Sequence, residues 1–261
     1  MKSSDNRPFI YEKQQLVETI CQLRYPTILS IDAKEPADFQ DLIRADFPRY
    51  ACQMDSVRTA DGKTQQVRNH SFITEDGTFK ISLTKDFVAL STIRYPGWEG
   101  FARMLDEPLG QFIQVYKPAF FSRIGLRFLN AFSREKLGLT DRRWNDLFQP
   151  QVLGILDDDE IDESEVIKCS VDVERRLGDR FGIKLHAGPG NIRRTIRSAS
   201  GLQTIQEPET RFILDLDVYS SGNTPLNAAA ETLDALHGHA DRIFSDAITD
   251  TLHDALEPAE L

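Results

Sequence analysis

The sequence has few cysteines and no long apolar run, and both absences narrow the class of protein. Its three cysteines, Cys21, Cys52 and Cys169, are odd in number and widely spaced, so neither a disulfide framework nor a Cys-x-x-C pair is expected. No stretch approaches the roughly 18 consecutive apolar residues of a membrane helix, and the first residues lack the apolar segment of a signal peptide. We therefore expect a cytoplasmic protein without a membrane partner.

Two further absences concern chemistry and charge. Neither the Gly-x-Ser-x-Gly nucleophile motif nor the His-Glu-x-x-His zinc motif occurs, so hydrolytic enzymes of these kinds have no positive support. Basic side chains are in deficit: Lys and Arg total 31 against 41 Asp and Glu, and the formal net charge is -10. Because affinity for nucleic acid comes largely from basic side chains, this balance argues against a nucleic-acid partner.

What is present is an ordinary globular composition with clear periodicity. Hydrophobic residues make up 40% of the 261 residues and charged residues 28%, which is enough apolar material for a core without disulfides or metal. Alternating and helical spacings predict one order of elements twice. The first half is a strand at 17–25, a helix at 36–47, three strands within 67–95 and a helix at 98–116. The second half is a strand at 120–132, a helix at 141–155, strands at 166–174, 181–187 and 211–219, and a helix from 225 onward.

The two halves also share residues. Leu23, Arg24 and Tyr25 match Leu126, Arg127 and Phe128, and a second offset pairs Val88 with Phe212, Leu90 with Leu214 and Tyr95 with Tyr219. We interpret this as an internal duplication, with repeats at 1–118 and 119–261 that form one continuous structural domain. Chance similarity of ordinary strand and helix patterns is the alternative.

The predicted fold class is α+β, built from two helix-grip-like units joined edge to edge. In each unit antiparallel strands curl around the final helix and leave the other face of the sheet open. By element order alone, the saddle-like result resembles the architecture of the TATA-binding protein, which bears on fold and not on function.

Four segments together resemble a known family: "VETICQLRYP", "RIGLRFLN", "FILDLDVY" and "IFSDAITDTL". They are similar to a sporadically distributed, uncharacterised bacterial family of about the same length, and the resemblance spans most of the chain. It implies no catalytic residues. The patchy distribution of that family implies an accessory role in bacterial defence or on a mobile element.

Strand alternation places a set of polar side chains on the open face of the sheet. Bidentate contacts from its arginines to a carboxylate or phosphate would make it a binding surface. The alternative is that the arginines and carboxylates pair with each other across neighbouring strands. The side chains in this set are Gln22, Arg24, Ser82, Arg123, Arg127, Asp172, Glu174, Asp215, Asp217 and Tyr219.

Other segments give weaker signals. Gly188 and Gly190 suggest a loop that could hold an anion together with Arg193 and Arg194, although it matches neither the Walker nor the dinucleotide pattern. The acidic run at 157–165 lacks the spacing of a calcium loop and is expected to be a solvated linker. His237, His239 and His253, together with Asp241, are expected on an exposed surface of the last helix.

The sequence thus predicts a non-catalytic binding module that engages a protein partner, a second copy of the chain or a small anionic ligand, without a cofactor. One alternative is a metal-dependent enzyme that uses Asp172, Glu174, Asp215 and Asp217. Another is nucleic-acid binding through the saddle, which the shared carboxylates oppose.

Overall fold

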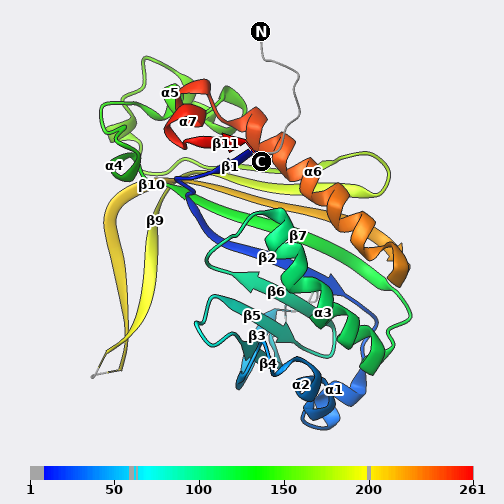
Figure 1. Ribbon diagram of the computed structural model, residues 1–261. Helices are drawn as coiled ribbons and strands as arrows, with labels where there is room; N and C mark the ends of the chain where they lie inside the picture. Colours follow the sequence, from blue (N-terminus) through cyan, green and yellow to red (C-terminus); the bar gives the residue numbers. More distant parts are fainter. Residues whose placement is uncertain (1–8, 59–61, 63, 199–200, 261) are drawn as a thin grey trace.

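The computed structural model describes residues 9–58, 62, 64–198 and 201–260, and its centre is a large antiparallel sheet (Figure 1). The strands are β2 (Leu16–Arg24), β3 (Arg49–Arg58), β4 (Thr64–Ile73), β5 (Phe79–Leu83), β6 (Phe87–Thr92), β7 (Phe121–Phe132), β8 (Val171–Arg176), β9 (Phe181–Ser198) and β10 (Gly201–Thr224). Their order across the nine-stranded sheet is β3-β4-β5-β6-β2-β7-β10-β9-β8. The predicted α+β class is confirmed, and both halves of the chain contribute to the same sheet.

Two long helices, α3 (Trp98–Tyr116) and α6 (Ala229–Ala247), lie over the same face of this sheet (Figure 1). The remaining helices are short: α1 (Leu29–Ala33), α2 (Ala37–Ile43), α4 (Arg134–Leu137), α5 (Trp144–Leu147) and α7 (Asp250–Ala255). Near the chain ends, β1 (Phe9–Tyr11) pairs with β11 (Pro258–Glu260) in a separate two-stranded sheet. Within the described residues, no helix is both long and apolar enough to cross a membrane.

The core lies between the sheet and the two long helices, as strand alternation predicts. In β2, Cys21 and Leu23 are fully buried and Tyr25 follows them into the core, whereas Arg24 points from the opposite face and is exposed. Tyr25 packs against Phe112 of α3, with ring centroids 4.8 Å apart. The two-residue period of side chains along a strand therefore explains why Arg24 is exposed although Leu23 and Tyr25 are buried.

Two tight turns connect β4, β5 and β6. The Asp76-Gly77 turn joins β4 to β5, with Gly77 at φ 75° and the Asp76 carboxylate accepting from the Thr78 backbone N–H at 2.9 Å. The Lys85-Asp86 turn joins β5 to β6. The three strands predicted within 67–95 are confirmed as β4, β5 and β6.

Several predicted elements are wrong in extent. The strands predicted at 181–187 and 211–219 are the much longer β9 and β10, and the helix predicted at 36–47 ends at Ile43. The helix predicted at 141–155 is only α5, because Pro150 forces Gln149 into an extended conformation and short 3-10 turns at Pro150–Val152 and Gly154–Asp157 follow. The strand predicted at 166–174 begins only at β8. The helix predicted from 225 divides into α6 and α7, since Ile248 is extended and forms a β-bridge with Phe148.

The longest of the elements that the sequence does not predict is β3. β3 forms an edge of the sheet and pairs with β4 along its whole length, from Arg49 opposite Ile73 to Arg58 opposite Thr64. Its sequence, RYACQMDSVR, has little apolar alternation, which is common in an edge strand with solvent on several sides.

Candidate functional site

Seven of the ten predicted open-face residues fall into one cluster of polar contacts on β7, β8 and β10, whereas Gln22 and Arg24 lie on β2 and Ser82 on β5. Arg127 donates from Nε to Asp215 Oδ1 at 2.7 Å and from Nη2 to Asp215 Oδ2 at 2.5 Å. Arg123 donates from Nη2 to both oxygens of Asp217 at 2.8 Å. The hydrogen bonds to Asp215 raise the pKa of the Arg127 guanidinium. These two arginines are thus occupied by carboxylates from the neighbouring strand.

Two glycines make room for this arrangement. A Cβ added at Gly125 would lie 2.2 Å from Arg123 Nη1, so the guanidinium of Arg123 crosses the strand through the space above this glycine. Likewise, a Cβ at Gly182 would lie 2.7 Å from the Tyr219 hydroxyl oxygen. The Arg123 guanidinium carbon lies 4.8 Å from the centre of the Tyr219 ring, which gives a cation–π contact.

The remaining carboxylates of the cluster have partners too. Glu174 accepts a hydrogen bond from the Tyr219 hydroxyl at 2.9 Å, which raises the pKa of Tyr219, and it lies 3.6 Å from Lys184 Nζ. Asp172 lies 2.7 Å from His186 Nδ1, and this hydrogen bond lowers the pKa of the Asp172 carboxyl. The open face therefore carries both positive and negative side chains, and these side chains pair with one another.

Arg24 has a different hydrogen-bond partner from Arg127, although the alternative of ion pairs across neighbouring strands predicts an acidic partner for both. Its Nε donates to Gln22 Oε1 at 2.9 Å. The reason is its register: Arg24 lies opposite Phe87 on one side and Arg123 on the other, so neither neighbouring strand offers a carboxylate there. The predicted acidic pairing of Arg24 is wrong.

The loop that was predicted to hold an anion is instead part of a strand. Gly188 and Gly190 lie inside β9, opposite Ile213 and Arg211 of β10, and β9 continues past them. At Gly188, a Cβ would lie 2.4 Å from the carbonyl oxygen of Cys169, so close approach of the chain explains this glycine. The backbones of Arg193 and Arg194 belong to β9, while their side chains lie outside the described part of the structure.

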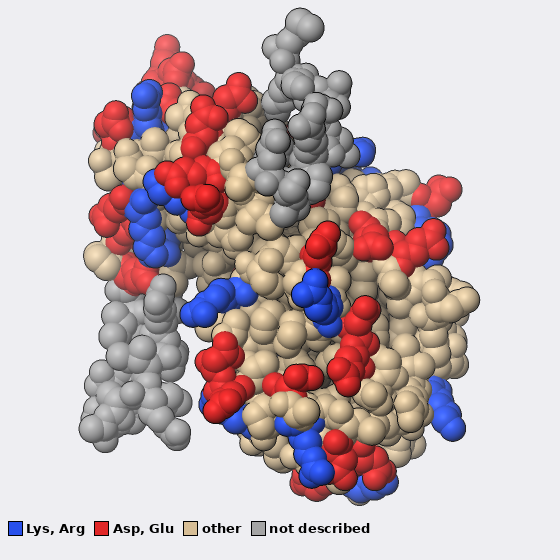
Figure 2. Space-filling view, viewed as in Figure 1, with Lys and Arg blue, Asp and Glu red and all other residues tan. Residues whose placement is uncertain are grey.

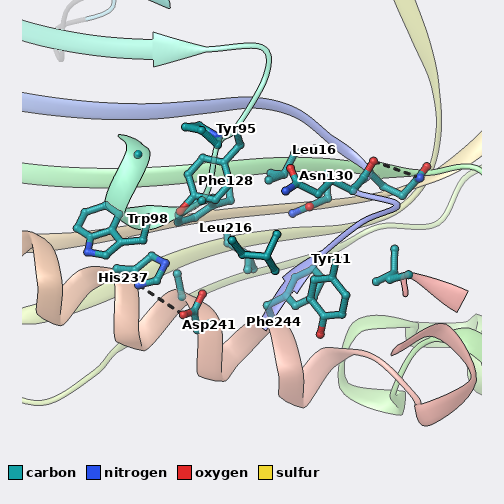
Figure 3. Close-up of a pocket in the computed structure, with 18 of the residues that line it drawn as sticks. Tyr11, Leu16, Tyr95, Trp98, Phe128, Asn130, Leu216, His237, Asp241 and Phe244 are labelled. Carbon is teal, nitrogen blue, oxygen red and sulfur yellow. Dashed lines mark hydrogen bonds and ion pairs between the residues drawn. The ribbon is translucent and has the colours of Figure 1, made fainter. Parts of the chain in front are cut away.

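The structure contains a cavity of about 670 Å³ that the sequence did not predict. It lies on the helix-covered side of the sheet, between α3, α6 and β1, with β2, β7 and β10 as its floor. Figure 3 shows its mostly apolar wall around a small number of polar groups. The wall includes Leu16, Tyr95, Trp98, Phe128, Leu216 and Phe244.

Aromatic contacts hold this wall together. The Trp98 ring stacks on His237 at a centroid distance of 4.5 Å and an interplanar angle of 13°, which joins α3 to α6. The Trp98 indole N–H also donates to Asp234 Oδ1 at 2.9 Å. Tyr95 meets Phe128 edge to face at 5.6 Å. These contacts fix the two helices at a separation that leaves the cavity open.

The polar groups of the cavity come mainly from α6. His237 and Asp241 are one helical turn apart, with His237 Nδ1 3.4 Å from Asp241 Oδ2 (Figure 3). Burial raises the pKa of the Asp241 carboxyl to about 6 and lowers the pKa of the His237 imidazole to about 4. At neutral pH the pair is therefore a carboxylate beside a neutral imidazole, and not two opposite charges. The Asp241 side chain keeps 54% of its accessible surface, and it borders the cavity.

The chain ends complete the cavity. Tyr11 of β1 and Leu256, which follows α7, both border it, and the Tyr11 hydroxyl lies 3.0 Å from His253 Nδ1. Burial and then the negative charge of Asp241 raise the pKa of Tyr11 to about 12. The buried Tyr95 hydroxyl has no hydrogen-bond partner among the described residues.

The predicted exposure of His237 is wrong, since its side chain is only 16% exposed. A sequence signal for this was available. His237, Ala240, Asp241 and Phe244 follow the i, i+3, i+4, i+7 spacing of one helix face, and Ala240 and Phe244 belong to the predicted apolar stripe. His239 contacts Phe181 at a centroid distance of 5.2 Å, and His253 lies on α7 and not on the same helix.

Comparison with known proteins does not assign the chain to a family: no family model matches the chain, and no curated protein matches it in sequence. The metal-ligand interpretation gains no support either. Within the ranges described, no group of three or more His, Cys, Asp or Glu side chains could hold a metal ion.

Proposed function

We propose that the protein is a non-catalytic binding module that holds a small molecule with an apolar body in the cavity between α3 and α6. The cavity itself carries this proposal. At about 670 Å³ it is within the range of small-molecule sites, and its apolar wall with few polar groups is typical of them. Its floor is sheet and its sides are helices, so the cavity is built on rigid elements.

The open face offers a weaker site for the small anionic ligand predicted from the sequence. A phosphate or carboxylate would have to displace Asp215 from Arg127 and Asp217 from Arg123, at the cost of two charge-assisted contacts. A protein partner or a second copy of the chain stays a prediction for this face. For nucleic acid, the open face pairs its arginines with the carboxylates of Asp215 and Asp217 and so offers no basic stripe. Figure 2 shows the opposite, helix-covered side, where acidic and basic side chains are also scattered.

An internal duplication is also part of the proposal. It is supported by the central pairing of β2 with β7 and by a long helix, α3 or α6, over the same face in each half. The register does not allow both sequence offsets to hold together. If Cys21 is superposed on Ile124, its partner Leu90 corresponds to Ser220, the partner of Ile124, and not to Leu214. The saddle-like architecture rests on this duplication and stays a proposal with it.

A neutral fluorescent probe tests the binding proposal. N-phenyl-1-naphthylamine emits more strongly in apolar surroundings, and we expect saturable binding to the wild type. Leu16→Trp fills the cavity and should abolish the signal, whereas Leu29→Trp, at a side chain that is 74% exposed on α1, should leave it intact. Leu16→Phe is the milder variant if Leu16→Trp does not fold. Equal binding by the wild type and both Leu16 variants would refute the proposal.

A further inference from the structure

The cavity combines aromatic side chains with two carboxylates, Asp241 and Glu99, and among the described residues no Lys or Arg forms an ion pair with either. Asp241 contacts His237 on α6, which is neutral at pH 7. Of the described residues that line the cavity, the only Lys or Arg is Arg103, which is exposed on α3 and makes no ion pair with Asp241. A half-exposed carboxylate at the border of an apolar cavity, without a counter-charge, favours a ligand that brings one.

The side chains around Asp241 suit a cation as well. Tyr11, Tyr95, Trp98, Phe128 and Phe244 are all aromatic lining residues, and aromatic faces attract organic cations. Figure 3 shows these rings around the space into which Asp241 points. The same carboxylate would repel a carboxylate or phosphate of a ligand, so the cavity discriminates by charge as well as by size.

We propose that the ligand of this cavity is an organic amine, an apolar and preferably aromatic body that carries a protonated nitrogen, and that Asp241 binds the ammonium group. This inference rests on the proposed function, because it names the ligand class of the same cavity. The ammonium N–H groups would donate to the Asp241 carboxylate in a charge-assisted hydrogen bond. The apolar body would lie against Leu216, Phe128 and Phe244.

Three size-matched probes test the ligand class: 2-(1-naphthyl)ethylamine, 2-(1-naphthyl)ethanol and 1-naphthylacetate. Binding is measured by calorimetry at pH 7.5, and by Trp98 fluorescence with Trp98→Phe as the control for the origin of the signal. The wild type should bind the amine about tenfold more tightly than the alcohol, and the carboxylate most weakly. Asp241→Asn should bring the amine and the alcohol within about twofold of each other. Asp246→Asn, at an exposed acid on the same helix, should behave like the wild type.

The outcomes separate the two proposals. If the alcohol binds but the amine has no advantage, or if Asp241→Asn keeps the full preference for the amine, the amine inference is wrong and the cavity proposal stands. If none of the probes binds and N-phenyl-1-naphthylamine also fails, both are wrong. The pH gives a second readout: acidification from 7.5 to 5 protonates Asp241, whose pKa lies at about 6, and should weaken the amine but not the alcohol. The other titratable or charged lining groups are Tyr11, Tyr95, His237, Glu99 and Arg103, and Asp241→Asn separates their contribution.

Discussion

The Trp98 indole and the His237 imidazole stack 4.5 Å apart, and this contact connects the start of α3 to the middle of α6 in the wall of the cavity. The two residues are far apart in sequence. Their contact and the hydrogen bond from Trp98 to Asp234 set the distance between the helices. The cavity thus depends on side chains that also form its wall.

A double-mutant cycle between these two residues should show coupling. Trp98→Ala and His237→Ala should each lower the free energy of unfolding, and the coupling between them should be about 0.5–1.5 kcal/mol, as for other aromatic pairs. The measurement is urea unfolding followed by circular dichroism. His239→Ala is the control, since His239 contacts Phe181 and not Trp98, and it should show no coupling to Trp98→Ala. Additive losses from Trp98→Ala and His237→Ala would contradict the prediction.

The opposite pKa shifts of Asp241 and His237 predict opposite pH dependences of stability. The pKa of Asp241 is about 6 in the folded protein against 3.8 ordinarily, so its protonation stabilises the fold and that contribution is lost as the pH rises through 6. The pKa of His237 is about 4 against 6.5 ordinarily, so its contribution is present above 6.5 and is lost as the pH falls through 4.

Acidification from pH 6.5 to 4.5 should therefore destabilise Asp241→Asn more than the wild type, and His237→Gln less than the wild type. Urea midpoints at the two pH values measure the difference, and Asp246→Asn should follow the wild type. Parallel pH dependences for Asp241→Asn and the wild type would show that the carboxyl does not titrate in this range.

The space above Gly125 makes a prediction for the open face. Gly125→Ala should displace Arg123 and weaken its pair with Asp217, at a cost of about 1 kcal/mol. Once Arg123→Ala has removed the guanidinium, adding Gly125→Ala should cost nothing more. Gly110→Ala is the matched control: it lies in α3 with no atom within 4 Å of its added Cβ, and it should stabilise the protein slightly. Equal costs of Gly125→Ala with and without Arg123 would rule out this packing argument.

The buried ion pair between Arg211 and Glu209 in β10 should contribute more to the stability of the protein than the pair between Arg123 and Asp217 on the open face. Arg211 is only 8% exposed, with its Nε 3.4 Å from Glu209 Oε2, and Glu209 also accepts hydrogen bonds from the Ser133 hydroxyl and the Glu135 backbone N–H. Arg211 also pairs with Glu207 and keeps that carboxylate in Glu209→Ala, so we expect a loss of about 2 kcal/mol from the hydrogen bonds and the second ion pair of Glu209. Glu231→Ala, at an exposed acid of α6, should change the stability by less than about 0.5 kcal/mol. A loss below about 1 kcal/mol for Glu209→Ala would contradict the expectation.

The parts of the structure that follow from local geometry could be predicted from the sequence. Side chains alternate along any strand, so the opposite directions of Leu23 and Arg24 follow from the pattern alone. The pairing of Arg127 with an acid was one of two predicted outcomes, and the register with β10 decides it. For Arg24, the register that places Arg123 and Phe87 beside it could not be obtained from alternation.

The cavity could not be predicted, because its wall comes from distant parts of the chain. Tyr11, Leu16, Trp98 and Asp241 belong to β1, β2, α3 and α6, and no local pattern relates them. The spacing of His237 and Asp241 was visible, but their environment depends on where α3 lies. The helix predicted at 141–155 is interrupted for a local reason, since Pro150 disfavours a helical conformation at Gln149 in spite of the apolar helical spacing.

The position of a bound amine tests the account most directly. A crystal structure of the protein with 2-(1-naphthyl)ethylamine should show the naphthalene ring between Phe128 and Phe244, with the nitrogen within hydrogen-bond distance of the Asp241 carboxylate. Electron density for the probe at Arg123 and Arg127 on the open face, with the cavity between α3 and α6 unoccupied, would contradict it.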